Sequence, residues 1–173
     1  MMRWAMDRWP HAKFVAKVDD DVLLNPWMIK RSLDSHTNSS FIGKKYVGHR
    51  PIRNEHDKWY LPTWLYRDEL FPEYLGGPCY IIRGDLVSQI YSQALKTPLI
   101  NLEDIFYTYL VAKRSLKFSL THEPKFQTDW LRNSDPCSYW SWASIHDTSP
   151  KDMLYIWPKL QEISKLNDIC SIG

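Results

Sequence analysis

Three consecutive aspartates, Asp19, Asp20 and Asp21, follow a short apolar run at residues 13–18. Such a run predicts a β-strand, and a strand that ends in carboxylates places them at the sheet edge where open α/β folds bind ligands. Hard divalent cations prefer oxygen ligands, so two carboxylates one residue apart on an extended chain can face one ion or the diphosphate bound to it. The triplet therefore indicates a metal and nucleotide site.

A second interpretation of the triplet is a solvated turn that caps the helix expected to begin near Pro26, since proline is favoured at helix-starting positions. Capping uses a single aspartate, however. Three adjacent carboxylates repel one another unless a cation or hydrogen-bond donors offset them. The triplet alone leaves both interpretations open.

Strands alternating with helices are expected to position the triplet. Strands are predicted at residues 13–18, 79–82 and 117–120, a strand pair at 41–43 and 46–48, and helices at about 26–33, 84–95, 103–113 and shortly after Pro150. A Gly-rich turn is expected at residues 76–78, and a polar surface loop at 50–58. The alternation predicts one α/β domain over residues 1–173.

The composition fits a globular domain with an excess of aromatic side chains. Of 173 residues, 44% are hydrophobic and 24% are charged, with nine Trp and ten Tyr. Aromatic faces stack on sugar rings, although any single Trp is more often used in packing. The net charge of +2 is too small for nucleic-acid binding, and no nucleic-acid partner is expected.

No apolar run approaches the roughly 20 residues that span a bilayer. Residues 1–9 resemble the middle of an amphipathic helix, so we expect the chain to lack an earlier segment. The residues Asn38-Ser39-Ser40 form a glycosylation sequon, which weakly favours a secretory compartment.

The three cysteines, Cys79, Cys137 and Cys170, match no metal-binding spacing. One disulfide with a free thiol, three thiols, and a bond to a partner in another segment all remain open.

Several separated segments occur in one order: residues 13–22, Lys58-Trp59-Tyr60, residues 71–77 before 80–82, Glu103-Asp104-Ile105 and Ser144-Ile145-His146. This order resembles the β-1,3-galactosyltransferase-like family (glycosyltransferase family 31), which includes β-1,3-N-acetylglucosaminyltransferases and the Fringe proteins. The resemblance extends over nearly the whole chain. Each motif is weak by itself, and the five in sequence are jointly specific.

The resemblance implies an α/β fold of the GT-A type with a single Rossmann-like domain. It also implies inverting transfer of galactose, or of N-acetylglucosamine, from a UDP-sugar to a glycan acceptor in β-1,3 linkage, usually with Mn²⁺. The acceptor would be a glycoprotein or glycolipid in the Golgi lumen, and the membrane would be reached only through an N-terminal anchor that this sequence does not show.

The same resemblance assigns roles around the triplet. Asp21 is expected to be the direct metal ligand, and Asp19 and Asp20 to orient the ribose, the transferred sugar or metal-bound water, with Asp19 close to the metal. His146 resembles the late histidine that several members use as a second metal ligand, and neutral imidazole suits that role. His122 is a weaker rival.

Asp104 is the expected general base, which takes the acceptor hydroxyl proton as that oxygen attacks the anomeric carbon. Glu103 is expected to contact the donor. The alternative is ordinary helix-start chemistry, with Asn101 as N-cap and the acids at the positive end of the helix dipole.

Gly76 and Gly77 are expected to let the backbone approach the donor sugar closely, because they have no Cβ. The family's Gly-Gly-Gly-Tyr becomes Gly77-Pro78-Cys79-Tyr80 here. Proline removes an N–H donor, so contacts made by that backbone are expected to differ.

The family's earlier strand and helix region, which holds the uracil, is not visible in the sequence. We therefore expect residues 1–173 to be the C-terminal portion of a catalytic domain, with an exposed sheet edge or apolar face near Phe14, Val15 and Val18. An inactive, carbohydrate-binding pseudoenzyme of the same fold is the main alternative. A metal-dependent phosphotransferase is disfavoured because no phosphate-cradling Gly loop is present.

Overall fold

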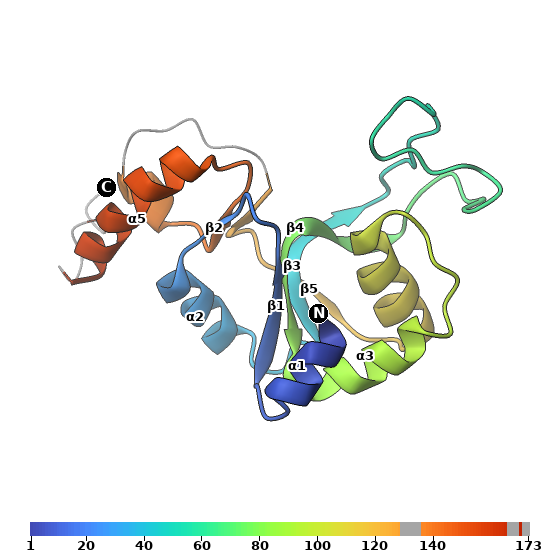
Figure 1. Ribbon diagram of the computed structural model, residues 1–173, viewed down its shortest axis with the longest axis horizontal. Coiled ribbons are helices and arrows are strands. Elements are labelled where there is room, and N and C mark those ends of the chain that lie inside the picture. The colour runs from blue at the N-terminus through green and yellow to red at the C-terminus, as the bar shows by residue number, and fades with distance from the viewer. Residues whose placement is uncertain (129–135, 166–169, 171–173) are drawn as a thin grey trace.

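The structure is a computed structural model that describes residues 1–128, 136–165 and 170 (Figure 1). Its helices are α1 (Met2–Arg8), α2 (Pro26–Ser35), η1 (Gly84–Leu86), α3 (Val87–Ala94), η2 (Ile105–Ser115), α4 (Pro136–Trp140) and α5 (Pro150–Lys165). Its strands are β1 (Phe14–Val18), β2 (Leu23–Leu24), β3 (Phe41–Val47), β4 (Glu73–Arg83), β5 (Leu120–His122), β6 (Phe126–Gln127) and β7 (Ser144–Ile145). The expected α/β class is confirmed.

The strands form a larger mixed sheet and a smaller one. The larger sheet has the order β1-β4-β3-β5, in which β4 pairs antiparallel with both neighbours and β3 pairs parallel with β5. The smaller sheet has the order β2-β7-β6. Because β2 follows β1 after only four residues, the smaller sheet lies close to the end of β1.

Helices cover both faces of the larger sheet (Figure 1). Alternate residues of the strands face opposite sides, as the pleat requires. Phe41, Tyr80 and Ile82 pack in the cluster that includes α1, α3 and η2, whereas Ile42 and Ile81 pack in the cluster that includes α2. The sheet is thus buried between two helical layers, and the aspartate triplet follows one of its edge strands.

The first turn of α2 is capped by Asn25 and not by the triplet. The Asn25 side chain accepts a hydrogen bond from the backbone N–H of Met28 at 3.2 Å, and Pro26 occupies the first position of the helix. The solvated-cap interpretation of the triplet is therefore wrong, because a neighbouring residue already supplies the cap.

The structure corrects several predicted elements. The expected strand pair at 41–43 and 46–48 is the single strand β3, and the expected turn at 76–78 lies inside β4. The last helix is longer than expected, and β5 begins three residues beyond its predicted start. Local composition suggested turns within residues 41–48 and at 76–78, but pairing with neighbouring strands keeps the backbone extended in β3 and β4.

Strand β1 lies at an edge of the larger sheet, as expected. Phe14 and Val18 pack against the α2 cluster and Val15 against the opposite cluster, so all three are half-buried rather than left on an uncovered apolar face. In the part of the chain that the structure describes, no helix combines the length and the apolar character needed to cross a membrane.

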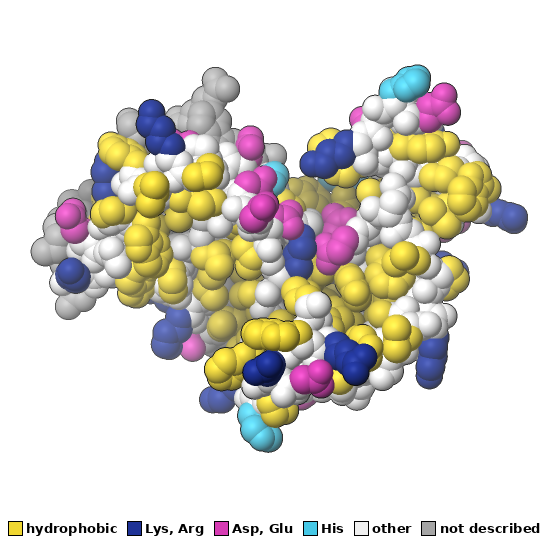
Figure 2. Space-filling view, viewed as in Figure 1, with side chains coloured by type: hydrophobic (Ala, Val, Ile, Leu, Met, Phe, Trp, Pro, Cys, Tyr) yellow, Lys and Arg dark blue, Asp and Glu magenta, His cyan; other side chains and the backbone are white. Residues whose placement is uncertain are grey.

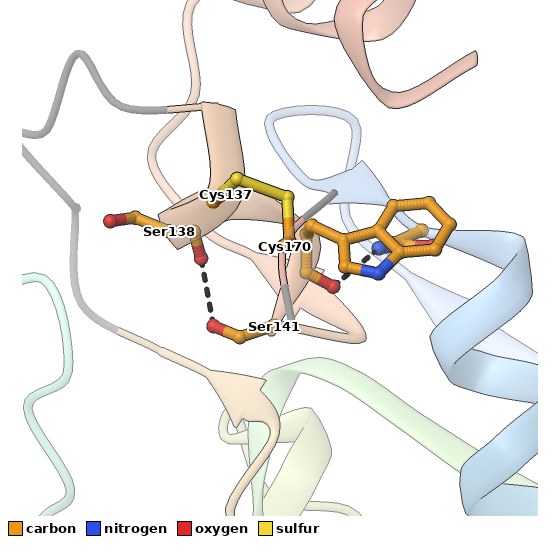
Figure 3. The surroundings of a disulfide bond; sticks show 6 residues. Cys137, Ser138, Ser141 and Cys170 are labelled. Atoms are coloured by element: carbon orange, nitrogen blue, oxygen red, sulfur yellow. Dashed lines mark hydrogen bonds between the residues drawn. A yellow bond between two sulfur atoms is a disulfide. The ribbon is translucent and has the colours of Figure 1, made fainter. Parts of the chain in front are cut away.

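A disulfide bond joins Cys137 of α4 to Cys170, which follows α5 in sequence (Figure 3). Beside it, the Ser141 hydroxyl donates to the Ser138 carbonyl and the Asn25 side chain donates to the Trp140 carbonyl. Cys79 is a free, buried thiol. One of the cysteine arrangements left open by the sequence, a single disulfide with one free thiol, is the one present.

Candidate functional site

The triplet begins where β1 ends, opposite the Gly76–Pro78 stretch of β4. Val18 pairs with Cys79, and the next backbone N–H, that of Asp19, donates to the Pro78 carbonyl at 3.0 Å. The antiparallel register therefore fixes where the carboxylates stand relative to the two glycines.

Strand β4 tolerates Pro78 because its register with β3 is interrupted there. Gly43 pairs with Tyr80, but Lys45 pairs with Leu75, so residues 76–79 lie opposite the single residue Lys44. A bulge of this kind relieves a proline of the ladder hydrogen bond it cannot donate. It also leaves backbone carbonyls free to bind side chains of the site.

His146 reaches the triplet through the smaller sheet. Leu23 of β2 pairs antiparallel with Ile145 of β7, so the residues before β2 lie beside those after β7. Nε2 of His146 is 3.4 Å from Oδ2 of Asp21. One ligand atom from each of Asp19, Asp21 and His146 lies within 4.8 Å of the other two. The predicted convergence of these three residues is confirmed.

The orientation of His146 leaves the correct nitrogen free. Its Nδ1 lies 2.8 Å from the Thr128 carbonyl oxygen, which can only accept, so Nδ1 carries the proton. Neutral imidazole then presents the lone pair of Nε2 towards Asp21. Oδ1 of Asp21 is buried and has no hydrogen-bond partner among the described residues. Two carboxylates, one of them with an oxygen that has no hydrogen-bond partner, and an imidazole nitrogen that faces them fit a divalent cation.

Two other sequence candidates stand apart from this cluster. Asp20 is exposed and is not among the three residues whose ligand atoms converge. Nδ1 of His122 accepts the backbone N–H of Lys45 at 3.1 Å, which joins β5 to β3. His122 therefore stabilises the larger sheet, and the geometry favours His146 as the metal ligand.

Lys17 is a site residue that the sequence analysis missed. Its ammonium group donates to Oδ1 of Asp19 and to the Gly77 carbonyl, each at 2.5 Å, and lies 3.3 Å from Oε2 of Glu103. Burial lowers the pKa of Lys17, but the hydrogen bonds and charges of Asp19 and Glu103 outweigh it, and the pKa is raised. Lys17 is the one charged residue of β1, and it lies two residues before Asp19, on the same side of the strand. This position is the sequence feature that could have identified it as a site residue.

Glu103 is held on both of its oxygens. The Tyr80 hydroxyl donates to Oε1, and the Lys17 ammonium lies beside Oε2. Tyr80 is fully buried in the core of the sheet, so this contact anchors Glu103 to β4. Glu103 is therefore suited to orient neighbouring groups.

Asp104 caps helix η2, and its Oδ1 accepts the backbone N–H of Ile105 at 2.8 Å. Burial raises the pKa of the Asp104 carboxyl, and the charge of Glu103 adds to this, although hydrogen bonds to backbone N–H groups and the charge of Lys17 oppose it. Asn101 donates its side-chain N–H to the Tyr60 carbonyl at 2.7 Å and is not the N-cap. Asp104 thus has the helix-start position and also the raised basicity of a general base.

We call Asp19, Asp21 and His146 the metal-type cluster. Two of its members, Asp19 and His146, line the same open pocket of about 670 Å³ as Asp104. Asp19, Glu103, Asp104 and His146 all contribute to its wall, with Lys17 among them. Figure 2 shows acidic side chains gathered in the hollow at the centre of this face. Sequence segments that are far apart therefore meet in one cavity.

The two glycines of β4 occupy different surroundings. A Cβ on Gly76 would lie 2.8 Å from the Tyr46 ring and 3.3 Å from the Thr128 methyl group, so no side chain fits without movement. A Cβ on Gly77 would lie 3.5 Å from Oδ2 of Asp104, an ordinary contact distance. Gly76 is required by packing, whereas Gly77 keeps the space in front of Asp104 open.

A second hollow, of about 810 Å³, lies beside α2 and the disulfide. Its carboxylate, Asp34, is already paired with Lys30 at 2.6 Å. No group of three converging metal-ligating side chains occurs there among the described residues. The chemistry therefore points to the pocket at the end of β1.

The chain is similar to known proteins over most of its length. Residues 1–122 match the family model described as galactosyltransferase. The match includes the triplet, the two glycines and Asp104, whereas His146 lies beyond it.

Two relatives illustrate the similarity. The chain is 27% identical over 165 residues to beta-1,3-galactosyltransferase 2 of Homo sapiens, covering 93% of this chain and 39% of the relative. It is 31% identical over 164 residues to beta-1,3-galactosyltransferase 1 of Mus musculus, covering 90% of this chain and 48% of the relative. The chain spans less than half the length of these relatives.

Proposed function

This chain belongs to the galactosyltransferase family, and on that premise we propose that it carries the catalytic residues of an inverting β-1,3-hexosyltransferase. The donor is UDP-galactose, with UDP-N-acetylglucosamine as the second choice, and the acceptor is a glycan. The domain is of the GT-A type. The α/β architecture, with carboxylates at the end of a strand and a cleft beside them, supports that assignment.

Asp19, Asp21 and His146 hold the divalent metal, Mn²⁺, in this proposal. The buried oxygen of Asp21 that has no hydrogen-bond partner, and the Nε2 of His146 that faces Asp21, support it. When bound there, the cation neutralises charge on the diphosphate leaving group. Lys17 keeps the Asp19 carboxylate in place, and Asp20 contacts the ribose or the transferred sugar.

Asp104 is the general base. It accepts the proton from the acceptor hydroxyl group as that oxygen attacks the anomeric carbon on the face opposite the UDP. The observation that carries this assignment is that Asp104 lines the same pocket as Asp19 and His146, with its pKa raised by burial. Glu103, held by Tyr80 and Lys17, contacts the donor and Gly77 leaves space for the sugar.

The disulfide supports a secretory location, because such bonds persist in oxidising compartments. We therefore place the reaction in the Golgi lumen, with glycoprotein or glycolipid acceptors. The convergence of two carboxylates and an imidazole, with a half-buried base on the wall of the same pocket, favours catalysis over an inactive carbohydrate-binding role, which would require none of these to meet.

The test is transfer from each UDP-sugar, with Mn²⁺, by the wild-type chain and by Asp104→Asn. The variant keeps the shape and the bond from Ile105 but cannot accept the proton. Turnover is expected to fall by about 10²-fold or more, with the affinity for UDP and Mn²⁺ unchanged. Wild-type turnover should fall as the pH is lowered through the raised pKa of Asp104.

Asp152→Asn is the matched control, since Asp152 also stands at a helix start and bonds to Ser149 at 2.6 Å, outside the pocket. It should retain turnover. Near-normal turnover of Asp104→Asn would leave only the helix-start explanation for Asp104.

A further inference from the structure

The segment between β3 and β4, residues 48–72, leaves the larger sheet and projects away from it (Figure 1, teal to green). Gly48 turns the chain out of β3 with a φ of 71°, a conformation that glycine adopts readily. The neck is closed by two backbone hydrogen bonds, from Gly48 to the Phe71 carbonyl at 2.9 Å and from Phe71 to the His49 carbonyl at 2.7 Å. We call this segment the projecting loop.

The projecting loop is held in shape by specific contacts. The Arg53 guanidinium donates to the carbonyls of Leu61, Tyr66 and Asp68, and both Leu61 and Tyr66 are buried. Asn101, which precedes Glu103 and Asp104, donates to the Tyr60 carbonyl. The loop is thereby tied to the segment that carries the proposed base.

One side of the loop forms a wall of the pocket that contains Asp104. His49, Arg50, Lys58 and Trp59 all line it. Trp59 is 54% exposed although it borders a cavity, and the Lys58 ammonium lies 5.2 Å from its ring centroid. An exposed indole at a pocket wall presents a flat apolar face of the kind on which a sugar ring stacks.

The charges on this wall are positive, and among the described residues neither has a carboxylate partner, although Lys58 lies over the Trp59 ring. Neither Arg50 nor Lys58 has an ion pair or hydrogen bond through its side chain to any other residue that the structure describes. Lys17 and Lys45, by contrast, are paired with the carboxylates of Asp19 and Glu73. Arg50 and Lys58 are therefore available to an anionic ligand.

We propose that the projecting loop is the acceptor-binding wall, on which Trp59 stacks against a sugar ring while Arg50 and Lys58 bind an anionic group of the same glycan. That group is the carboxylate of a uronic acid or a sulfate ester. Acceptor selection thus rests on charge as well as on shape. This inference depends on the proposed function, which supplies the base at the floor of the pocket.

The experiment measures glycan binding without turnover. The purified chain, with saturating Mn²⁺ and UDP, is titrated calorimetrically with three probes: a glucuronate-terminated disaccharide, 6-sulfated N-acetyllactosamine and neutral N-acetyllactosamine. At least one anionic probe should bind about fivefold or more tightly than the neutral one, and the two anionic arms distinguish carboxylate from sulfate.

Variants locate the binding surface. Trp59→Ala should weaken all bound probes about tenfold, whereas Trp64→Ala should not, because Trp64 is 79% exposed on the same loop but does not line the pocket. The double variant Arg50→Gln/Lys58→Gln should abolish the preference for anionic probes. Arg67→Gln, an exposed cation of the loop outside the pocket, is its control.

Equal binding of neutral and anionic probes would contradict the role of Arg50 and Lys58. Unchanged glycan binding by Trp59→Ala would contradict the proposal that the projecting loop binds the acceptor. If the double variant lost affinity for UDP but still bound glycans with the same preference, Arg50 and Lys58 would bind the donor and not the acceptor, which would contradict the proposal. Normal UDP and Mn²⁺ binding without any glycan binding would contradict this inference alone. Trp59-dependent glycan binding without Mn²⁺ binding would instead contradict the proposed function.

Discussion

Nε2 of His146 faces Oδ2 of Asp21 at 3.4 Å, while the other ring nitrogen of the same histidine is fixed by the Thr128 carbonyl. The contact joins the end of β1 to the residue after β7. The residues of the metal-type cluster therefore come from segments of both sheets, and the geometry of the cluster depends on how the two sheets are placed.

His146→Ala is expected to weaken Mn²⁺ binding by at least about tenfold, because it removes a neutral nitrogen donor from a three-residue cluster. Calorimetric titration with Mn²⁺ checks this. His122→Ala is the control, since His122 is bonded to the Lys45 backbone. Equal loss in both variants, or loss only in His122→Ala, would show that the wrong histidine has been assigned.

Lys17→Met is expected to lower the free energy of unfolding by about 1–3 kcal/mol, because it leaves Asp19 and Glu103 without their shared cation. Both carboxylates are partly exposed, so the loss should lie towards the lower value. Lys17→Arg should restore part of it. Urea unfolding of these variants beside Lys13→Met, an exposed neighbour, measures the effect; similar curves for Lys17→Met and Lys13→Met would refute it.

Asp104→Asn is expected to stabilise the folded chain at neutral pH. Burial raises the pKa of Asp104 above its ordinary value of 3.8, so the folded state keeps a proton that the unfolded state has already lost. The cost of ionising Asp104 in the fold is absent below about pH 4 and grows as the pH rises from the unfolded to the folded pKa. The asparagine variant avoids this cost.

Thermal unfolding of wild type and Asp104→Asn between pH 4 and pH 8 checks this sign. The variant should unfold at a higher temperature near neutral pH, and the difference should shrink towards pH 4. If Asp104→Asn lost stability relative to wild type as the pH rose from 4 to 7, the fold would favour the charged carboxylate, and the prediction would be wrong.

Gly76→Ala and Gly77→Ala are expected to have different effects, the first on stability and the second on sugar transfer. The first should cost about 1–3 kcal/mol of stability, because its Cβ meets the Tyr46 ring. The second should change stability by less than about 1 kcal/mol but lower transfer, because its Cβ narrows the space before Asp104. Denaturation and turnover measured on both variants test the contrast; the reverse pattern would show that Gly77 is the structural glycine.

Local sequence patterns determined much of the framework. The apolar run before Asp19 predicted β1, and the spacing of apolar residues predicted the helix that follows Gly84. The order of short motifs indicated the family, which the match over residues 1–122 shows. These features are readable because strand alternation, helical periodicity and motif order are properties of neighbouring residues.

Long-range pairing decided the rest. The sequence around Gly76 and Pro78 predicted a turn, but β1 and β3 hold that segment extended within β4, with a bulge that accommodates the proline. Lys17 was overlooked because two of its three partners, Glu103 and the Gly77 carbonyl, are distant in sequence.

The sequence by itself determined which side chains were available: the aspartate triplet, Glu103-Asp104 and a late histidine. The tertiary structure brought Asp21 and His146 into the cluster that the resemblance predicted, and it alone decided that Asp104 lies half-buried beside Gly77 and that the cysteine pair is Cys137 with Cys170. The physical reason is that register, burial and side-chain contact arise from segments packing together, and none of these is encoded in the spacing of any one segment.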